Sequence, residues 1–235
     1  MYYEQAEYEI RCEWAQESAV RLAPHSDVVV IVDTLSFSTC VDIAVGRGAA
    51  VYPYKWIEAS AIEFAERVGG VVAGRRRSSE GYTLSPVSLV NIPDGTKLVL
   101  PSPNGSTLTL STGDKPTLAG CLRNARAVAS AAEQLGGSVL VVPAGERWPD
   151  GTLRLCFEDL IAAGAIITHL RGTKSPEALL AQAAFISLAD ELPALLRSCT
   201  SGKELIEQGF AQDVELAAQL NVSDVAPMMV DGAYR

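Results

Sequence analysis

The residues best suited to chemistry are three carboxylates that flank predicted elements of secondary structure. Asp33 closes the apolar run VVVIV, while Glu158 and Asp159 open a predicted helix that follows a strand and a long polar loop. A carboxylate that ends a buried strand costs free energy unless it is paired, hydrogen-bonded or bound to a metal. Asp33 beside Glu158 and Asp159 would form an oxygen-rich site for Mg²⁺. Acidic residues in a first helical turn also suit the helix dipole, so a structural role for Glu158 and Asp159 stays open.

Hydroxyl side chains follow Asp33 at the start of the next predicted helix. Ser36, Ser38 and Thr39 could hydrogen-bond an anion together with the N–H groups of that helix start, or one of them could cap the helix. For the hydroxyls alone, capping is the favoured interpretation. For Asp33, a functional role is favoured.

A second polar group follows the strand predicted over 97–101. Asn104, Gly105 and Ser106 come directly after that strand. An Asn-Gly pair tolerates positive φ angles, so a tight turn is the favoured interpretation. The alternative is a backbone cradle for an oxyanion.

Two other stretches have a plain and a functional interpretation. Asn124 is a natural N-cap for a helix, and Arg123 before it is interpreted as a surface cation. Arg75, Arg76 and Arg77 form the one dense basic spot in the chain, which is either a solvated loop or an anion contact.

Composition excludes several classes of partner. The net charge is −9, from 19 basic and 28 acidic residues, so a nucleic-acid partner is not expected. The N-terminus carries too many charges for a signal peptide, and we see no apolar run that approaches the ~18 residues of a membrane span. Five cysteines lie far apart without a C-x-x-C pair, which fits a reducing cytoplasm. We therefore expect a cytoplasmic protein.

Several well-known chemistries lack their motifs here. His25 and His169 have no zinc-site spacing, and the chain has neither a P-loop nor a G-x-S-x-G elbow. The sequence VDTLS is similar to the strand end of aspartyl-phosphate phosphatases, but Leu35 stands where they have a second aspartate. Their mechanism would then lack a proton donor to the leaving group.

Alternating hydrophobic periods predict the elements that position these residues. Strands are predicted over 28–32, 49–54, 97–101 and 138–145, and helices over 38–45, 57–68, 124–135, 158–170 and 176–197, with two more between 203 and 220. Gly69-Gly70 and Gly136-Gly137 fall where helix C-caps belong, because glycine adopts the left-handed conformation readily. Alternating strands and helices indicate an α/β fold with a largely parallel sheet, in which ligands bind beyond the carboxyl ends of the strands. We expect residues 1–235 to form one domain, with two intimate α/β halves as the alternative.

The succession of these stretches resembles one known family. VVIVDTLSFSTCVDIAVGRGA, LPSPNGSTL, GCLRNARAVA, PAGE, LCFEDLIAAGAI and SGKELIEQGFAQDVELAAQL resemble the 2-phosphosulfolactate phosphatases, the ComB-like proteins, in the right order over nearly the whole chain. The resemblance implies a three-layer α/β/α fold with a mixed sheet. It also implies a Mg²⁺-dependent acid phosphatase acting on a small phosphorylated acid. Site residues implied by matching positions are Asp33, Ser38, Thr39, Asn104, Gly105, Ser106, Asn124, Glu158 and Asp159.

The chain departs from the family pattern at three places. Asp33-Thr34-Leu35-Ser36 stands where the family has Asp-Val-Leu-Arg, so an arginine that would suit an anion is replaced by Ser36. The family's Gly-Glu-Arg appears as Gly74-Arg75-Arg76, and Thr83 replaces an aspartate. We expect Arg76 or its neighbours to take over anion binding near Ser36.

The resulting hypothesis is a Mg²⁺-dependent phosphatase for a small phosphorylated acid. Asp33 would hold Mg²⁺ with Glu158 or Asp159, and backbone N–H groups near residues 104–106 and 38–39 would stabilise the transition state. Which carboxylate is ligand and which is base stays open. The alternative is a non-catalytic relative that binds a phosphorylated or carboxylated metabolite. A second copy of the chain, in a homodimer, is the protein partner kept as a hypothesis.

Overall fold

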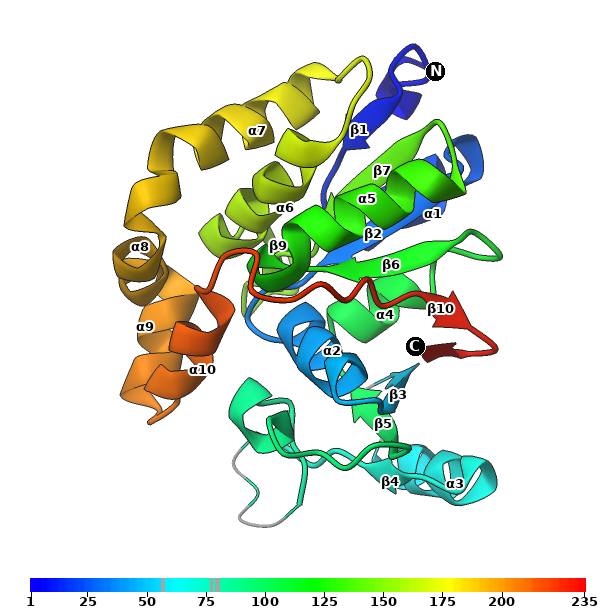
Figure 1. Cartoon of the computed structure of the whole chain (residues 1–235), viewed down its shortest axis with the longest axis vertical. Helices are drawn as coiled ribbons and strands as arrows, with labels where there is room; N and C mark the ends of the chain where they lie inside the picture. The colour runs from blue at the N-terminus through cyan, green and yellow to red at the C-terminus, as the bar shows by residue number, and fades with distance from the viewer. Residues whose placement is uncertain (56–57, 77, 79–80) are drawn as a thin grey trace.

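The computed structural model describes residues 1–55, 58–76, 78 and 81–235, which form an α/β protein with helices on both faces of a parallel sheet (Figure 1). This sheet, sheet A, has the strand order β1-β7-β2-β6, and all its pairs are parallel. Its strands are β1 (Ile10–Cys12), β2 (Val28–Val32), β6 (Thr117–Gly120) and β7 (Val139–Pro143). The predicted three-layer fold is confirmed.

Alternation along β2 directs side chains to both helical layers. Val28, Val30 and Val32 pack against helices α5 (Ala125–Leu135) and α6 (Phe157–His169). The intervening Val29 and Ile31 join the opposite layer, which contains Leu22 of α1 (Ala15–Leu22) and Leu108 of α4 (Gly105–Thr109). Every residue of β2 is buried, as expected for a central parallel strand covered on both faces.

A second sheet, sheet B, has the strand order β10-β11-β3-β5-β4. Strands β3 (Ala50–Tyr54), β4 (Val71–Val72) and β5 (Lys97–Pro101) are parallel, whereas β10 (Met229–Val230) and β11 (Ala233–Tyr234) are antiparallel. Helix α2 (Phe37–Gly46) contacts β3 of sheet B and β6 of sheet A, and lies between the sheets in Figure 1. Helix α3 (Glu58–Val68) packs on the other face of sheet B. The mixed, largely parallel strands that we predicted thus divide between two sheets, and the single-domain assignment stays a prediction.

The C-terminal half adds an outer layer of helices. It contains α7 (Pro176–Leu188), α8 (Leu192–Ser198), α9 (Thr200–Glu207) and α10 (Ala211–Ala217). A single helix over 176–197 was predicted, but a 3₁₀ turn at Ala189–Glu191 separates α7 from α8. The cause is Pro193 in the first turn of α8, because proline has no N–H to continue the ladder from the preceding helix.

The apolar character of this region corrects one expectation. By length and composition alone, Pro176–Ser198 is long and apolar enough to cross a membrane, with a mean hydropathy of 1.5. The expectation that no apolar run approaches ~18 residues is therefore wrong. In the structure Ala178, Ala181 and Phe185 of this segment are buried in the core, although only 22% of its apolar window is buried. One such helix is weak evidence for a membrane span.

Most predicted element boundaries agree with the structure within one or two residues, but α9 begins at Thr200, three residues before the range predicted for it. The helices predicted over 38–45, 124–135 and 158–170 begin and end within one residue of α2, α5 and α6. The helix predicted over 57–68 corresponds to α3, but Ile57 at its predicted start lies outside the described residues. Gly69 has the predicted left-handed conformation, with φ of +66°. Gly136 has not, because its φ is −179°. It is required for close packing instead, since a Cβ there would lie 2.3 Å from Cβ of Asp27.

Candidate active site

Asp33 lies where the carboxyl ends of the two sheets meet. It follows β2 of sheet A, and its Oδ2 accepts a hydrogen bond from N–H of Gly105, which follows β5 of sheet B, over 2.8 Å. Its Oδ1 accepts a longer bond of 3.4 Å from N–H of Phe37 at the start of α2. The side chain is buried, with 7% of its surface exposed. The predicted strand-end position of this carboxylate is confirmed.

Burial raises the pKa of Asp33 to about 7, and the nearby carboxylates of Glu146 and Glu158 add to the rise. The N–H groups of Gly105 and Phe37 oppose it. A carboxyl group with such a pKa can hold or release a proton near neutral pH, and perturbed carboxyl groups of this kind are common at functional sites.

Asp159 lies near the same strand ends and connects the loop after β2 with the loop after β7 through hydrogen bonds. Its Oδ1 accepts a hydrogen bond from N–H of Thr34 over 2.8 Å, and its Oδ2 accepts one from N–H of Gly145 over 2.9 Å. Burial, followed by the charges of Glu158 and Asp33, raises its pKa well above the ordinary value. Because both oxygens bind backbone N–H groups, this geometry suits a residue that supports the loops.

Glu158 is equally buried, at 3% exposure, but it is held differently. Its backbone carbonyl accepts a hydrogen bond from Oγ1 of Thr34, and its Oε2 accepts one from the thiol of Cys199 over 3.5 Å. Glu158 lies close to both other carboxylates, since its charge contributes to the raised pKa of Asp33 and of Asp159. Among the described residues, however, no group of three or more His, Cys, Asp or Glu side chains has the arrangement of a metal site.

A cavity of about 190 Å³ opens beside Asp33. Polar side chains on its wall include Asp33, Ser36, Arg76, Asn104 and Glu146. Glu146, which begins the short strand β8 (Glu146–Arg147), was not singled out from the sequence. Its Oε1 accepts a hydrogen bond from Nδ2 of Asn104, and burial raises its pKa. The strand-end rule that identified Asp33 could have found it, because Glu146 follows the end of β7 by three residues.

The favoured interpretation of residues 104–106 as a tight turn holds only for Asn104, which lies in a turn and is the N-cap of α4, because Gly105 and Ser106 belong to the helix. Gly105 packs so closely against Phe37 that a Cβ would lie 2.2 Å from Cδ1 of that ring. The N–H of Gly105 binds Asp33, so it is not open to an anion. The hydroxyl of Ser106 donates to the carbonyl of Leu100 over 2.8 Å and anchors the helix to β5.

Two other predicted site residues, Ser38 and Thr39, are fully buried and bind backbone groups. Ser38 donates to the carbonyl of Ile31 over 3.2 Å and accepts from N–H of Asp33 over 3.0 Å. Thr39 donates to the carbonyl of Thr34 over 2.8 Å. These hydroxyls shape the loop between β2 and α2, and neither lines the cavity.

Asn124 lies outside the cavity as well. Its Oδ1 accepts from N–H of Cys121 over 2.9 Å, and its Nδ2 donates to the carbonyl of Ala119 over 3.2 Å. Asn124 therefore closes the turn between β6 and α5. Arg123, interpreted as a surface cation, is largely buried and pairs with Asp42 through Nε at 2.8 Å.

Arg76 is the member of the basic cluster that reaches the cavity. Its Nη2 donates to Oγ of Ser36 over 2.5 Å, and its Nη1 pairs with the carboxylate of Asp213 in α10. The guanidinium also lies over the ring of Phe210, 5.2 Å from its centroid. Arg75 is exposed, and Arg77 lies outside the described residues.

Asp213 is itself fixed by the chain around it. It is 1% exposed, and its Oδ1 accepts hydrogen bonds from Oγ of Ser85 over 2.6 Å and from N–H of Val87 over 3.2 Å. A buried carboxylate with this many donors holds the guanidinium in one orientation.

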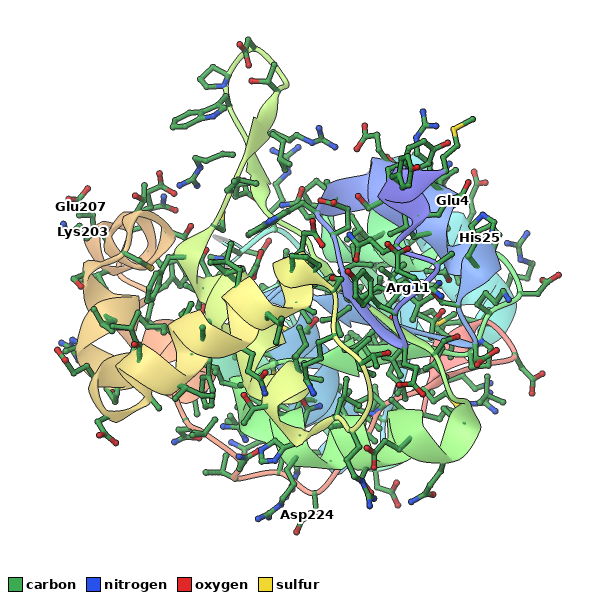
Figure 2. The ribbon with its side chains drawn as sticks, turned by 90° about the horizontal axis from the view of Figure 1, so that it is seen from above. Glu4, Arg11, His25, Lys203, Glu207 and Asp224 are labelled. Atoms are coloured by element: carbon green, nitrogen blue, oxygen red, sulfur yellow. The ribbon has the colours of Figure 1, made fainter. Side chains whose placement is uncertain are left out.

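Lys203 and Glu207 of the neighbouring helix α9 project away from the molecule (Figure 2).

Comparison with known proteins identifies relatives along most of the chain. The family model described as 2-phosphosulpholactate phosphatase matches residues 15–232. A probable 2-phosphosulfolactate phosphatase of Carboxydothermus hydrogenoformans is 33% identical over 210 residues, which cover 85% of this chain and 84% of the relative. The 2-phosphosulfolactate phosphatase of Methanothermobacter thermautotrophicus is 32% identical over 212 residues, which cover 88% of each chain. This chain belongs to the 2-phosphosulfolactate phosphatase family.

Proposed function

We propose that the chain hydrolyses the phosphate monoester of a small acid that carries a second anionic group, in keeping with the names of its relatives. The observation that carries the proposal is the placement of Arg76 in one cavity with Asp33 and Glu146. A guanidinium binds oxyanions through paired N–H groups, and carboxylates suit proton transfer or cation binding. One small cavity thus offers both an anion-binding group and acidic groups.

Arg76 supplies the cation that the Ser36 position lacks. The family pattern has an arginine at that position, and the small Ser36 side chain leaves room for the guanidinium that binds its hydroxyl. The geometry supports our expectation that Arg76 takes over anion binding. Ser36 then contributes by orienting Arg76 as well as by lining the cavity.

A hydrated Mg²⁺ fits part of the predicted ligand set. Mg²⁺ in proteins is commonly held by one or two carboxylates and keeps several waters. Asp33 and Glu146 line the cavity and have raised pKa values, so a nearby cation would stabilise their ionised forms. We therefore propose Asp33 as the principal ligand, assisted by Glu146 or Glu158, with Asp159 supporting the loops. When bound, Mg²⁺ would polarise the phosphoryl group and acidify the attacking water.

The protein's own groups would bind the substrate and move the proton. Arg76 would bind an anionic group of the substrate and help to stabilise the transition state. A carboxylate that does not hold the metal would accept the proton of the water, and Glu146 is the better placed, since it lines the cavity and Glu158 does not. The backbone cradle proposed near Gly105 has a smaller role than expected, since that N–H already binds Asp33.

A screen of small phosphate monoesters, with and without added Mg²⁺, tests the proposal. Released phosphate and the thermal melting temperature are measured on the same samples. Phosphate release that requires Mg²⁺ supports the proposal. Stabilisation by the same compounds without phosphate release would favour the alternative, a relative that only binds a phosphorylated or carboxylated metabolite.

The five free cysteines fit the cytoplasmic location that we propose.

A further inference from the structure

A second cavity, of about 300 Å³, lies at the end of α2 that is distant from Asp33. Its apolar wall is formed by Ile43, Val90, Leu216, Val222 and Val225. Asp33, Arg76 and Glu146 do not line it, so an inference about this cavity does not depend on the proposed function.

Asp42 on the wall of this cavity carries a carboxylate oxygen without a hydrogen-bond partner. The side chain is 1% exposed, and its Oδ2 accepts a hydrogen bond from Nε of Arg123 over 2.8 Å. Its Oδ1 is buried and has no partner in the described part of the chain. Buried carboxylate oxygens are rarely left without a donor in native proteins. Oδ1 is therefore open to a donor that reaches it through the cavity.

Ser223 is the neighbouring group that comes nearest to that role. Burial raises the pKa of Asp42, and the hydroxyl of Ser223, which is near enough to act as a hydrogen-bond donor, opposes the rise together with Arg123. The hydroxyl of Ser223 nevertheless accepts a hydrogen bond from N–H of Val225 over 3.3 Å and forms none with Oδ1. Ser223 lies in the segment after α10, from which Asp224 projects into solvent at the edge of the molecule (Figure 2). We expect a ligand that reaches Oδ1 to rotate the Ser223 side chain.

The charged side chains on the cavity wall favour a ligand that carries an anionic group in addition to a hydrogen-bond donor. The charges of Asp42 and Arg123 offset each other, and Nη1 of Arg123 donates to the carbonyl of Leu216 over 3.3 Å and to Oε1 of Gln219. Arg47, which caps the C-terminus of α2 and is exposed, adds a positive charge to the cavity wall. One buried acceptor, one accessible cation and an aliphatic wall define the chemistry of a complementary ligand.

We propose that this cavity binds a small aliphatic acid that also carries a hydroxyl or amino group. The hydroxyl or amino group donates to Oδ1 of Asp42, the carboxylate binds Arg47, and the aliphatic part packs against Val90 and Val222. An acid of the same shape without the donor leaves Oδ1 unpaired and binds more weakly.

Three probes of matched shape test the assignment on the full-length protein. They are 2-hydroxy-3-methylbutanoate, valine and 3-methylbutanoate, and only the last lacks a donor. Calorimetry is carried out with excess inorganic phosphate, which competes for the first cavity. At least one donor-bearing probe should bind about ten-fold more tightly than 3-methylbutanoate. Equal affinities, or no binding by any probe at ~10 mM, would overturn the proposal.

Two variants locate the binding. Val222→Trp narrows the cavity from a side chain that is 58% exposed, and Val20→Trp, at a 55% exposed position in α1, is the matched control. Binding should weaken about ten-fold or more in Val222→Trp and stay unchanged in Val20→Trp. Arg47→Glu, which reverses an exposed charge, should weaken binding as well and serves if Val222→Trp does not fold. Unchanged binding in a folded Val222→Trp or in Arg47→Glu would contradict the assignment.

Discussion

The guanidinium of Arg76 donates a hydrogen bond to the hydroxyl of Ser36 over 2.5 Å, although the two residues are 40 positions apart. Their contact brings a cation from the loop after β4 to the position at which the family pattern has an arginine. The anion-binding charge is thus retained in space while its place in the sequence differs. Substrate recognition should depend on Arg76.

We expect Arg76→Met to raise KM for substrates with a second anionic group by about ten- to hundred-fold, because a charged hydrogen bond contributes ~1.5–3 kcal/mol. Arg126→Met is the control, since Arg126 is 63% exposed and does not line the cavity. Steady-state kinetics on a bis-anionic substrate and on a simple monoester measure the effect. An equal loss on both substrates would contradict a role in recognising the second group.

Asp213→Asn should raise the same KM by a smaller factor, about three- to ten-fold, because the amide keeps the contacts with Ser85 and Val87 but no longer holds Arg76 by charge. The double variant Arg76→Met/Asp213→Asn should be no worse than Arg76→Met alone, since both changes remove one interaction. Asp42→Asn is the control, as Asp42 is another buried aspartate paired with an arginine, in the second cavity. Additive effects in the double variant would show that Asp213 acts independently of Arg76.

Asp33→Asn should retain the fold and lower phosphatase turnover by at least about a hundred-fold, with partial recovery at high Mg²⁺. The reason is that an amide oxygen is a weaker ligand than a carboxylate at the same place. Turnover against Mg²⁺ concentration measures the change. If Asp33 were a covalent nucleophile, added metal would restore nothing and the wild type should form an aspartyl-phosphate. Full activity at limiting Mg²⁺ would leave Asp33 with a structural role.

The stability of the metal-free protein should also depend on Asp33 and pH. The pKa of Asp33 is about 7 in the folded protein, whereas an unperturbed aspartate has a pKa of 3.8. Ionisation of Asp33 therefore destabilises the folded state as pH rises from about 4 to 7. Asp33→Asn removes this effect. In EDTA, its free energy of unfolding relative to wild type should therefore increase over that interval and level off above pH 7. The largest expected gain in the free energy of unfolding of Asp33→Asn over wild type is ~4 kcal/mol. The loss of one backbone hydrogen bond in the variant reduces this gain by about 1–3 kcal/mol. A constant difference between pH 4 and pH 8 would contradict the raised pKa.

Gly105→Ala should destabilise the protein by about 1–3 kcal/mol, because the new methyl group overlaps the Phe37 ring. Gly137→Ala is the control, since the nearest atom to a Cβ there is Oδ2 of Asp27 at 3.9 Å. Chemical denaturation of both variants measures the difference. Equal stability of the two would show that α4 can move away from α2 at little cost.

The sequence predicts the position of Asp33 well because its signal is local. A run of β-branched residues that ends in a carboxylate marks a strand end, and parallel strands place their carboxyl ends at one edge. Residues 104–106 were harder to interpret, since α4 is only five residues long and shows no helical period. Its stability comes from burying Leu108 against sheet A and from the Gly105–Phe37 contact, which are both tertiary.

The division into two sheets could not be predicted for a related reason. The apolar runs of β2 and β5 are similar, so nothing in either run specifies its partner strand. Strands β1, β4, β10 and β11 contain only two or three residues each, too few to show a period. Arg76 was predicted as an anion contact from composition and family pattern, but its partner Asp213 is 137 residues away and has no local signal.

Because the N–H of Gly105 binds the carboxylate of Asp33, the pKa of Asp33 depends on how the two sheets are placed at their junction. Asp33 follows β2 of sheet A, and the N–H that lowers its pKa belongs to Gly105, the first residue of α4, which follows β5 of sheet B. Burial is the largest cause of the raised pKa, so opening the junction to water would lower the proton affinity of Asp33 although the Gly105 bond is lost. Release of the proton from the proposed catalytic carboxylate and opening of the junction are therefore coupled, so in the metal-free protein this junction should open more readily at pH 8 than at pH 5.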